Sequence, residues 1–169
     1  MRIITFILTI IFVTITQMTL ACDCDSQGEF LIVAPKSKLV ALIKVTKYLT
    51  FANIYDKKIP MSMEVEIIEI FKGIETRKTV IVWGDDGIMC RPYLSQFDLG
   101  QYYVIAFGGG IDGTKGYGHK NEKPSDYSIS ICGDYWLKAN IKSKMATGAI
   151  SNKQTSIKLV DLKSKLNGK

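Results

Sequence analysis

Residues 61–67 read Met-Ser-Met-Glu-Val-Glu-Ile, and apolar side chains alternate with polar or charged ones. A period of two is typical of a β-strand that buries one face. The inward face would hold Met61, Met63, Val65 and Ile67, and the outward face Ser62, Glu64 and Glu66. The phase slips at Ile68-Glu69-Ile70, which predicts a β-bulge, and the strand is expected to end at Phe71-Lys72-Gly73. The stretch therefore favours a mainly β fold.

Four other stretches around this strand are also strand-like. They are residues 38–48, 79–83, 100–107 and 127–132, and in the first of them Leu39, Ala41, Ile43 and Val45 share one face. Residues 49–60 are predicted to be a hairpin loop, and residues 110–126 a long exposed loop, because Gly, Asn, Asp, Lys and Pro gather there. Five strands in about a hundred residues are typical of a small barrel.

The C-terminal part is predicted to be an extension, residues 136–169, after a domain spanning 22–135. Residues 136–150 give mixed signals. Residues 155–166 are expected to form a helix, because Leu159, Leu162 and Leu166 follow a helical spacing. Thr155 or Ser156 would cap its start.

The N-terminus has the order of a signal peptide. Arg2 precedes an uncharged, apolar run over residues 3–15, and Ala21 offers a small residue for cleavage. Residues 1–21 are therefore predicted to be removed on export. A transmembrane anchor is the alternative, but Thr16, Gln17 and Thr19 make the end of the run polar. No second run of membrane length follows, so we expect a secreted mature chain without a membrane span.

Composition argues against several function classes. The chain has 169 residues, 47% hydrophobic and 22% charged, which fits one domain with a core. Its net charge of +6 comes from scattered lysines, without the basic and aromatic stripe of a nucleic-acid surface. The single histidine, His119, lies in the glycine-rich loop, where we expect it to be solvated. No hydrolase, metalloprotease or phosphate-binding motif occurs. We expect no enzyme, no cofactor and no nucleic-acid partner.

The four cysteines are Cys22, Cys24, Cys90 and Cys132. Export would expose them to an oxidising compartment, where disulfides persist. Cys22 and Cys24 are too close to bond each other without severe strain, so each is expected to join one of the distant pair. Both bridges would tether the start of the mature chain, which indicates that this terminus has a function. Two alternatives remain, a zinc site on the four thiols and lipidation of Cys22.

Several of these pieces, taken in order, resemble the N-terminal, netrin-like domain of the tissue inhibitors of metalloproteinases. They are Cys22-Asp23-Cys24, the strand Leu39–Val45, Met63–Ile67 with Phe71-Lys72-Gly73, Cys90, Gly100–Phe107 and Cys132. The resemblance covers residues 22–135 and implies an OB-fold, a five-stranded barrel with flanking helices. It also implies the disulfides Cys22–Cys90 and Cys24–Cys132.

The resemblance further implies a function at the mature terminus. The α-amino and carbonyl groups of Cys22 would chelate the zinc of a target metalloprotease, and the protein would hold no metal of its own. Asp23 would enter the specificity pocket of the target, and Cys24 and Asp25 would contact it. Asp23 departs from the Thr that the family often carries. The alternative is a non-inhibitory netrin-like protein-binding module, secreted or lipid-anchored at Cys22.

Overall fold

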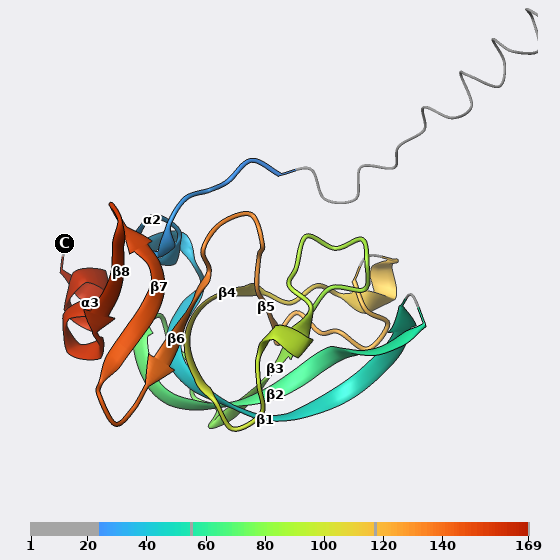
Figure 1. The fold of residues 1–169 in the computed structure, drawn as a ribbon. Coiled ribbons are helices and arrows are strands. Elements are labelled where there is room, and N and C mark those ends of the chain that lie inside the picture. Colours follow the sequence, from blue (N-terminus) through green and yellow to red (C-terminus); the bar gives the residue numbers. More distant parts are fainter. Residues whose placement is uncertain (1–23, 55, 117, 169) are drawn as a thin grey trace, which may run out of the picture.

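The computed structural model describes residues 24–54, 56–116 and 118–168, and its centre is a closed five-stranded barrel (Figure 1). The strands are β1 (Leu39–Ile54), β2 (Lys57–Lys72), β3 (Thr79–Trp83), β4 (Tyr102–Gly109) and β5 (Tyr127–Ser128). They follow the order β1-β2-β3-β5-β4, and β1 also pairs with β4, which closes the ring. The prediction of a mainly β, OB-type barrel with flanking helices is confirmed.

One apolar core fills the inside of the barrel. The inward face of β1 carries Leu39, Ala41, Ile43 and Val45, as the sequence predicted. Their neighbours in the same core are Met63 and Val65 of β2, Val80 and Val82 of β3, Tyr103, Ile105 and Phe107 of β4, and Tyr127 of β5. The alternating pattern of residues 61–67 therefore does select the buried face, although Ser62 is also buried and its hydroxyl lies 2.6 Å from that of Thr50.

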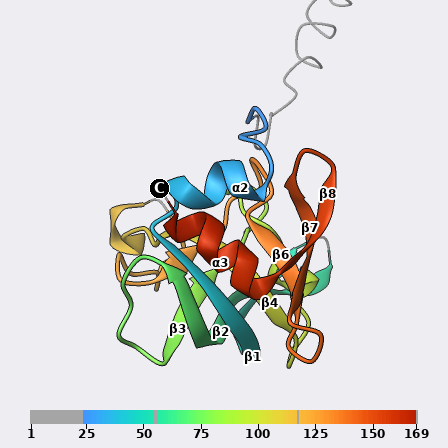
Figure 2. The ribbon, with the colours of Figure 1, turned by 90° about the vertical axis from the view of Figure 1, so that its left-hand side faces the viewer.

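A second core covers the outer face of β1 and β4. Val40 and Leu42 of β1 and Val104 and Ala106 of β4 point away from the barrel interior into this cluster. The covering elements are α2 (Phe30–Val33), β6 (Trp136–Asn140), β7 (Met145–Ser151), β8 (Gln154–Lys158) and α3 (Leu159–Asn167). Figure 2 shows α2 and α3 on the same side of the barrel, with α3 crossing over β1. Strands buried on both faces read as continuous apolar runs, as residues 39–43 do.

The C-terminal residues extend the same sheet. β6 pairs antiparallel with β4, β7 with β6, and β8 with β7. The helix predicted over 155–166 was wrong at its start, because residues 154–158 form β8 and pair with β7 through Ile157 and Ala146. The helix begins at Leu159, after a Lys158 N-cap without a side-chain bond, and buries Leu159 and Leu162. Burial of Ile157 as a strand residue outweighs the capping signal of Thr155 and Ser156.

The hairpin between β1 and β2 is longer than predicted. Residues 49–60 were expected to be a loop, but β1 runs to Ile54 and β2 starts at Lys57, with these two residues paired. Phe51 makes an edge contact with Tyr48, and the Lys58 ammonium lies 4.7 Å from the Phe51 ring centre. These same-strand and cross-strand contacts stabilise paired strands over residues 49–60, where composition alone predicts a loop.

The predicted bulge in β2 is present. Leu42 pairs with Glu69 and Ile43 with Ile67, so Ile68 has no partner in the register. The extra residue is 43% exposed. A bulge redirects side chains locally, and here it turns an isoleucine towards solvent.

Short 3₁₀ turns connect the remaining elements. They are η1 (Ala34–Lys36), η2 (Leu94–Gln96) and η3 (Gly113–Lys115). The shortest strand of the barrel is β5, which contributes two paired residues to β3 and two to β4. Over the described ranges, none of the helices is long and apolar enough to cross a bilayer. The predicted signal peptide, residues 1–21, lies outside the described residues.

Candidate functional site

Three chain segments from distant parts of the sequence meet around the cysteines. We call them together the cysteine ridge: residues 24–28, 85–91 and 130–133. The Cys24–Cys132 disulfide joins the first and third segments, with Cα atoms 5.7 Å apart. The Cys90 sulfur of the second segment lies within 4.8 Å of both of these sulfurs. The predicted Cys24–Cys132 bridge is confirmed, and the three cysteines in the described ranges lie together.

Backbone hydrogen bonds align the three segments of the ridge. The Gln27 N–H donates to the Cys132 carbonyl, and the Ile131 N–H donates to the Cys90 carbonyl over 3.2 Å. The first and third segments also approach each other closely at Gly28 and Gly133. A Cβ atom added to Gly133 would lie only 2.9 Å from the Gly28 carbonyl oxygen. The amino-terminal segment is therefore held by its backbone as well as by its disulfide.

The ridge is exposed along its outer edge. Cys24, Asp25 and Ser26 are exposed, and Ile88 of the second segment and Ile131 of the third are 75% and 44% exposed. Both aliphatic side chains are accessible to a partner. Residues 127–132 were expected to form one strand, but β5 ends at Ser128 and Ile131 lies outside it.

Two of the predicted site residues lie outside the described part of the chain. Cys22 and Asp23 are among residues 1–23, so the Cys22–Cys90 bridge and the zinc-chelating group stay predictions. Cys90 is not a free thiol. The predicted target-contacting residues Cys24 and Asp25 do lie together at the exposed end of the ridge.

The loop over 85–91 is shaped by its own aspartates. The Asp85 carboxylate accepts the Met89 N–H at 2.6 Å, and the Asp86 carboxylate accepts the Ile88 N–H at 3.2 Å. Gly87 takes a φ of +107°, which L side chains rarely adopt. The turn cluster Gly84–Gly87 thus forms two side-chain-to-backbone turns, and these hold Ile88 outward.

A buried ion pair supports the ridge from below. Arg91 donates through both terminal nitrogens to the two carboxylate oxygens of Glu122, each at 2.9 Å. The side chains are 7% and 0% exposed. Glu122 also accepts the Ile111 N–H at 2.8 Å. The description of 110–126 as an exposed loop was therefore wrong at Glu122, and no local pattern could pair it with a partner 31 positions away.

The single histidine, His119, contacts protein groups next to the ridge rather than solvent alone. The His119 ring stacks on Trp83, with centroids 4.9 Å apart. Its Nε2 lies 2.8 Å from the Gly84 carbonyl oxygen, which accepts, so Nε2 carries the hydrogen. Trp83 in turn donates from Nε1 to Asp126 at 2.8 Å. The expectation of a solvated histidine was wrong, because an aromatic neighbour and a carbonyl hold it.

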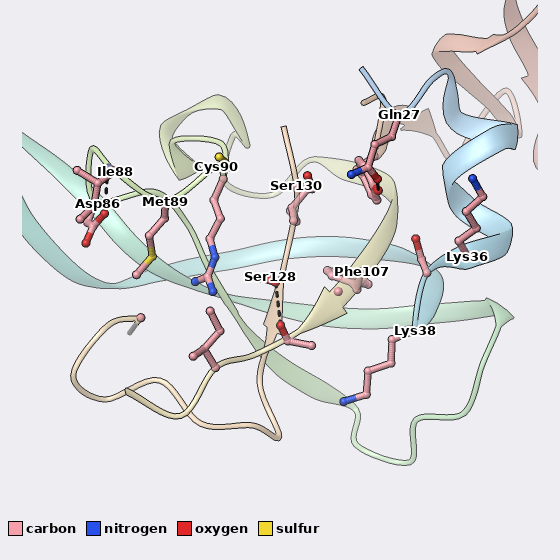
Figure 3. A pocket seen from close by; sticks show the side chains of 18 of the residues that line it. Gln27, Lys36, Lys38, Asp86, Ile88, Met89, Cys90, Phe107, Ser128 and Ser130 are labelled. Carbon is pink, nitrogen blue, oxygen red and sulfur yellow. Dashed lines mark hydrogen bonds between the residues drawn. The ribbon is translucent and has the colours of Figure 1, made fainter. Parts of the chain in front are cut away.

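A groove of about 840 Å³ runs along the inner side of the ridge (Figure 3). Met89 and Cys90 line one wall, Ser128 and Ser130 the middle, and Lys38 the other side. Gln27 and Tyr135 close its end, where the Tyr135 hydroxyl donates to the Gln27 side-chain oxygen. Burial raises the pKa of Tyr135, and burial followed by the nearby Glu29 charge raises the pKa of Asp134.

The cluster of sulfur atoms tests the alternative prediction that the cysteines bind zinc. Cys24, Cys90 and Cys132 form a group close enough to hold a metal ion. However, Cys24 and Cys132 share a disulfide, and none of the described cysteines is free. Zinc is bound by thiolates, so ligation here would first need reduction of the bridge.

The chain matches no model of a known protein family and no curated protein. The resemblance to the tissue inhibitors of metalloproteinases therefore rests on the order of its cysteines and strands.

Proposed function

We propose that the protein is a secreted metalloprotease-inhibitor-like protein that acts through the segment ahead of Cys24. One observation carries this proposal: the exposed run from Cys24 to Ser26 is fixed by the Cys24–Cys132 disulfide, beside Cys90. A segment that is exposed and already ordered loses little conformational entropy when it enters the cleft of a partner. This pre-organisation is what a terminus needs in order to act as an inhibitor.

The chemistry follows from cleavage after Ala21. The α-amino and carbonyl groups of Cys22 would then bind the zinc of the target and displace its water, which is the nucleophile of such proteases. The amine must be neutral to bind, and an α-amino group has a pKa of about 8. It loses its proton readily to a competing metal ion.

The ridge would set the choice of target. Ile88 and Ile131 of the ridge offer exposed apolar side chains, and Asp25 offers a charge. Asp23 would enter the pocket beside the zinc, and an unpaired carboxylate buried in an apolar pocket costs several kcal/mol. A protease with a basic pocket therefore suits this chain better than one with an apolar pocket.

The chelation step is tested by moving the amine. The mature protein, a form with one alanine added before Cys22, and a form with one alanine added after Lys169 are compared for inhibition of a panel of zinc endopeptidases. We expect the first addition to abolish inhibition while both disulfides form, and the second to leave it unchanged. Inhibition that survives the first addition would rule out chelation by the Cys22 amine.

The pocket contact is tested by Asp23→Thr. Removing the carboxylate should strengthen inhibition of proteases with an apolar pocket and weaken it for proteases with a basic pocket. Asp98→Thr, which removes an exposed carboxylate outside the cysteine ridge, is the control and should change both classes little. Equal effects of the two substitutions would contradict the role given to Asp23.

The groove beside the ridge favours a second candidate, a non-inhibitory netrin-like binding module, secreted or lipid-anchored at Cys22. Chelation by a terminus does not require a groove of about 840 Å³, whereas a binding module does use such a surface. The mass of the mature N-terminal peptide separates the inhibitor from the lipid-anchored form of this module, and the inhibition panel separates it from the secreted form. A free Cys22 amine permits chelation, and a lipid-modified Cys22 excludes it. The expectation that the chain is not an enzyme stays a prediction.

A further inference from the structure

We propose that a second groove, between α3 and the bulge of β2, binds a peptide segment in which an aliphatic side chain is flanked by carboxylates. We call it the α3 groove, and its volume is about 540 Å³. Its lining includes Leu42 of β1, Ile68 of β2, Ile141 of the β6–β7 turn, and Leu159 and Val160 of α3. None of these belongs to the cysteine ridge, so the inference does not depend on the proposed inhibition.

The apolar part of the groove is incompletely covered. Leu42 and Leu159 are buried beneath it, while Ile68, Ile141 and Val160 are 43%, 39% and 69% exposed. Three elements thus each bring one exposed aliphatic residue to a single concavity. For Ile68 this position is imposed by the bulge, which takes the residue out of the strand register. Contiguous exposed apolar surface of this kind marks a contact site.

The rim of the groove is basic. Lys144, Lys158 and Lys163 line it, and among the described lining residues Glu69 is the one carboxylate. Lys163 bonds Glu69 at 2.6 Å, whereas Lys144 and Lys158 form no ion pair within the described chain. The Leu159 N–H donates to the Lys144 carbonyl at 2.9 Å, which holds the β6–β7 turn against the start of α3. Two unpaired cations therefore flank an apolar hollow.

Charge decides between the possible occupants. A second copy of this chain would bring a net charge of +6 to a basic rim, so self-association is disfavoured. A carboxylate on either side of an aliphatic side chain would meet Lys144 and Lys158 while the side chain fills the hollow. A concavity of this size suits one or two side chains of a peptide rather than the flat surface of a bilayer.

The test uses fluorescence anisotropy of a labelled synthetic peptide, Asp-Glu-Leu-Glu-Ile-Asp, titrated with the full mature protein. We expect saturable binding that weakens with salt. A peptide with serine in place of leucine and isoleucine, and one with glutamine in place of every acid, should each bind about tenfold more weakly. Equal binding of the three peptides, or no binding of the first, would overturn the proposal.

Matched variants locate the binding. Lys144→Glu with Lys158→Glu should weaken binding about tenfold or more, as should Val160→Asp, which is tolerated in the first turn of a helix. Lys57→Glu, an equally exposed charge reversal in the distant hairpin, should bind like the wild type. Circular dichroism checks that each variant is folded. Loss of binding in the Lys57 variant as well, or saturable binding to vesicles of phosphatidylcholine and phosphatidylserine but not to the peptide, would contradict the assignment.

Discussion

The cysteine ridge and the α3 groove both expose aliphatic side chains outside the barrel, but different forces hold them in place. In the ridge, a disulfide and a buried ion pair join segments that lie 108 and 31 positions apart. In the groove, one bulge and one amphipathic helix place Ile68 and Val160 beside a continuous apolar core. The ridge is thus built from a few strong links, and the groove from many weak contacts. Single substitutions should therefore affect the two regions differently.

The largest effect is expected from removing the disulfide of the ridge. Cys24→Ser with Cys132→Ser frees a loop with a sequence separation of 108 residues, which the chain-entropy model values at about 5 kcal/mol. Urea unfolding under oxidising conditions measures the loss. Ser95→Ala, an exposed control, should change the free energy of unfolding very little. A loss no larger than that of the control would mean that hydrogen bonds alone hold the ridge.

The buried ion pair should come next. Glu122→Gln leaves the Arg91 guanidinium buried without its counter-charge, at an expected cost of about 3–4 kcal/mol in unfolding free energy. The double variant Arg91→Met with Glu122→Leu removes both charges and should lose less than the single variant. If the double variant loses more, the pair contributes more than charge compensation, and the hydrogen bond to Ile111 would be the first candidate.

On the groove side, a single core truncation should cost less than either ridge change. Leu162→Ala opens a cavity under α3, where Leu162 is fully buried, and should cost about 3 kcal/mol. Val160→Ala on the same helix removes an exposed side chain and should cost about 0.5 kcal/mol or less. Chemical denaturation compares the two variants. Similar losses would show that α3 does not pack as described.

The smallest effect concerns an ion pair that is exposed on one side only, since the Arg77 side chain is 41% exposed and the Glu75 side chain 7%. The Arg77 side chain bonds Glu75, and Tyr127 adds a second bond, which lowers the pKa of Glu75 from 4.5 to about 2. A lowered pKa in the folded state contributes stability above the unfolded value, and this stability is lost as pH falls from 4.5 towards 2. Because Arg77 is 41% exposed, the contribution should be about 1 kcal/mol or less.

Glu75→Gln tests this link. The wild type should lose more stability than the variant as pH falls through that window, and the two should respond alike above it. Urea midpoints measured at several pH values give the comparison. Parallel curves over the whole acid range would contradict the assignment of the titration to Glu75.

The sequence predicted best what depends on local periodicity. The alternation at residues 61–67, the shared face of Leu39 and Ile43, and the bulge at Ile68 all follow from side chains that alternate across a strand. The strands at 79–83 and 100–107 were predicted instead from short apolar runs next to turn residues. The strand at 127–132 was predicted too long, because β5 ends at Ser128. Where two signals competed, as at residues 155–158, burial of Ile157 against β7 decided the outcome and the local capping pattern failed.

The site was predictable where covalent chemistry limits the choices. Four cysteines, two of them too close to pair, leave few arrangements, and Cys24–Cys132 was among them. For Arg91, Glu122 and His119, no chemical rule limits the possible partners in this way. Their partners depend on which loops the closed barrel brings together, and that depends on the whole topology rather than on neighbouring residues.

The shortness of β5 has a kinetic consequence. With two register pairs to each neighbour, this seam can open without breaking the long β1–β2 ladder, so its amides should exchange with solvent through local opening. The amides of the β1–β4 ladder, with six register pairs, should exchange only through much larger openings. Because the chain continues from β5 into Ser130 and Ile131 of the ridge two residues later, each such opening would also loosen the ridge. The barrel would thus open locally next to the cysteine ridge, where we propose that a partner binds.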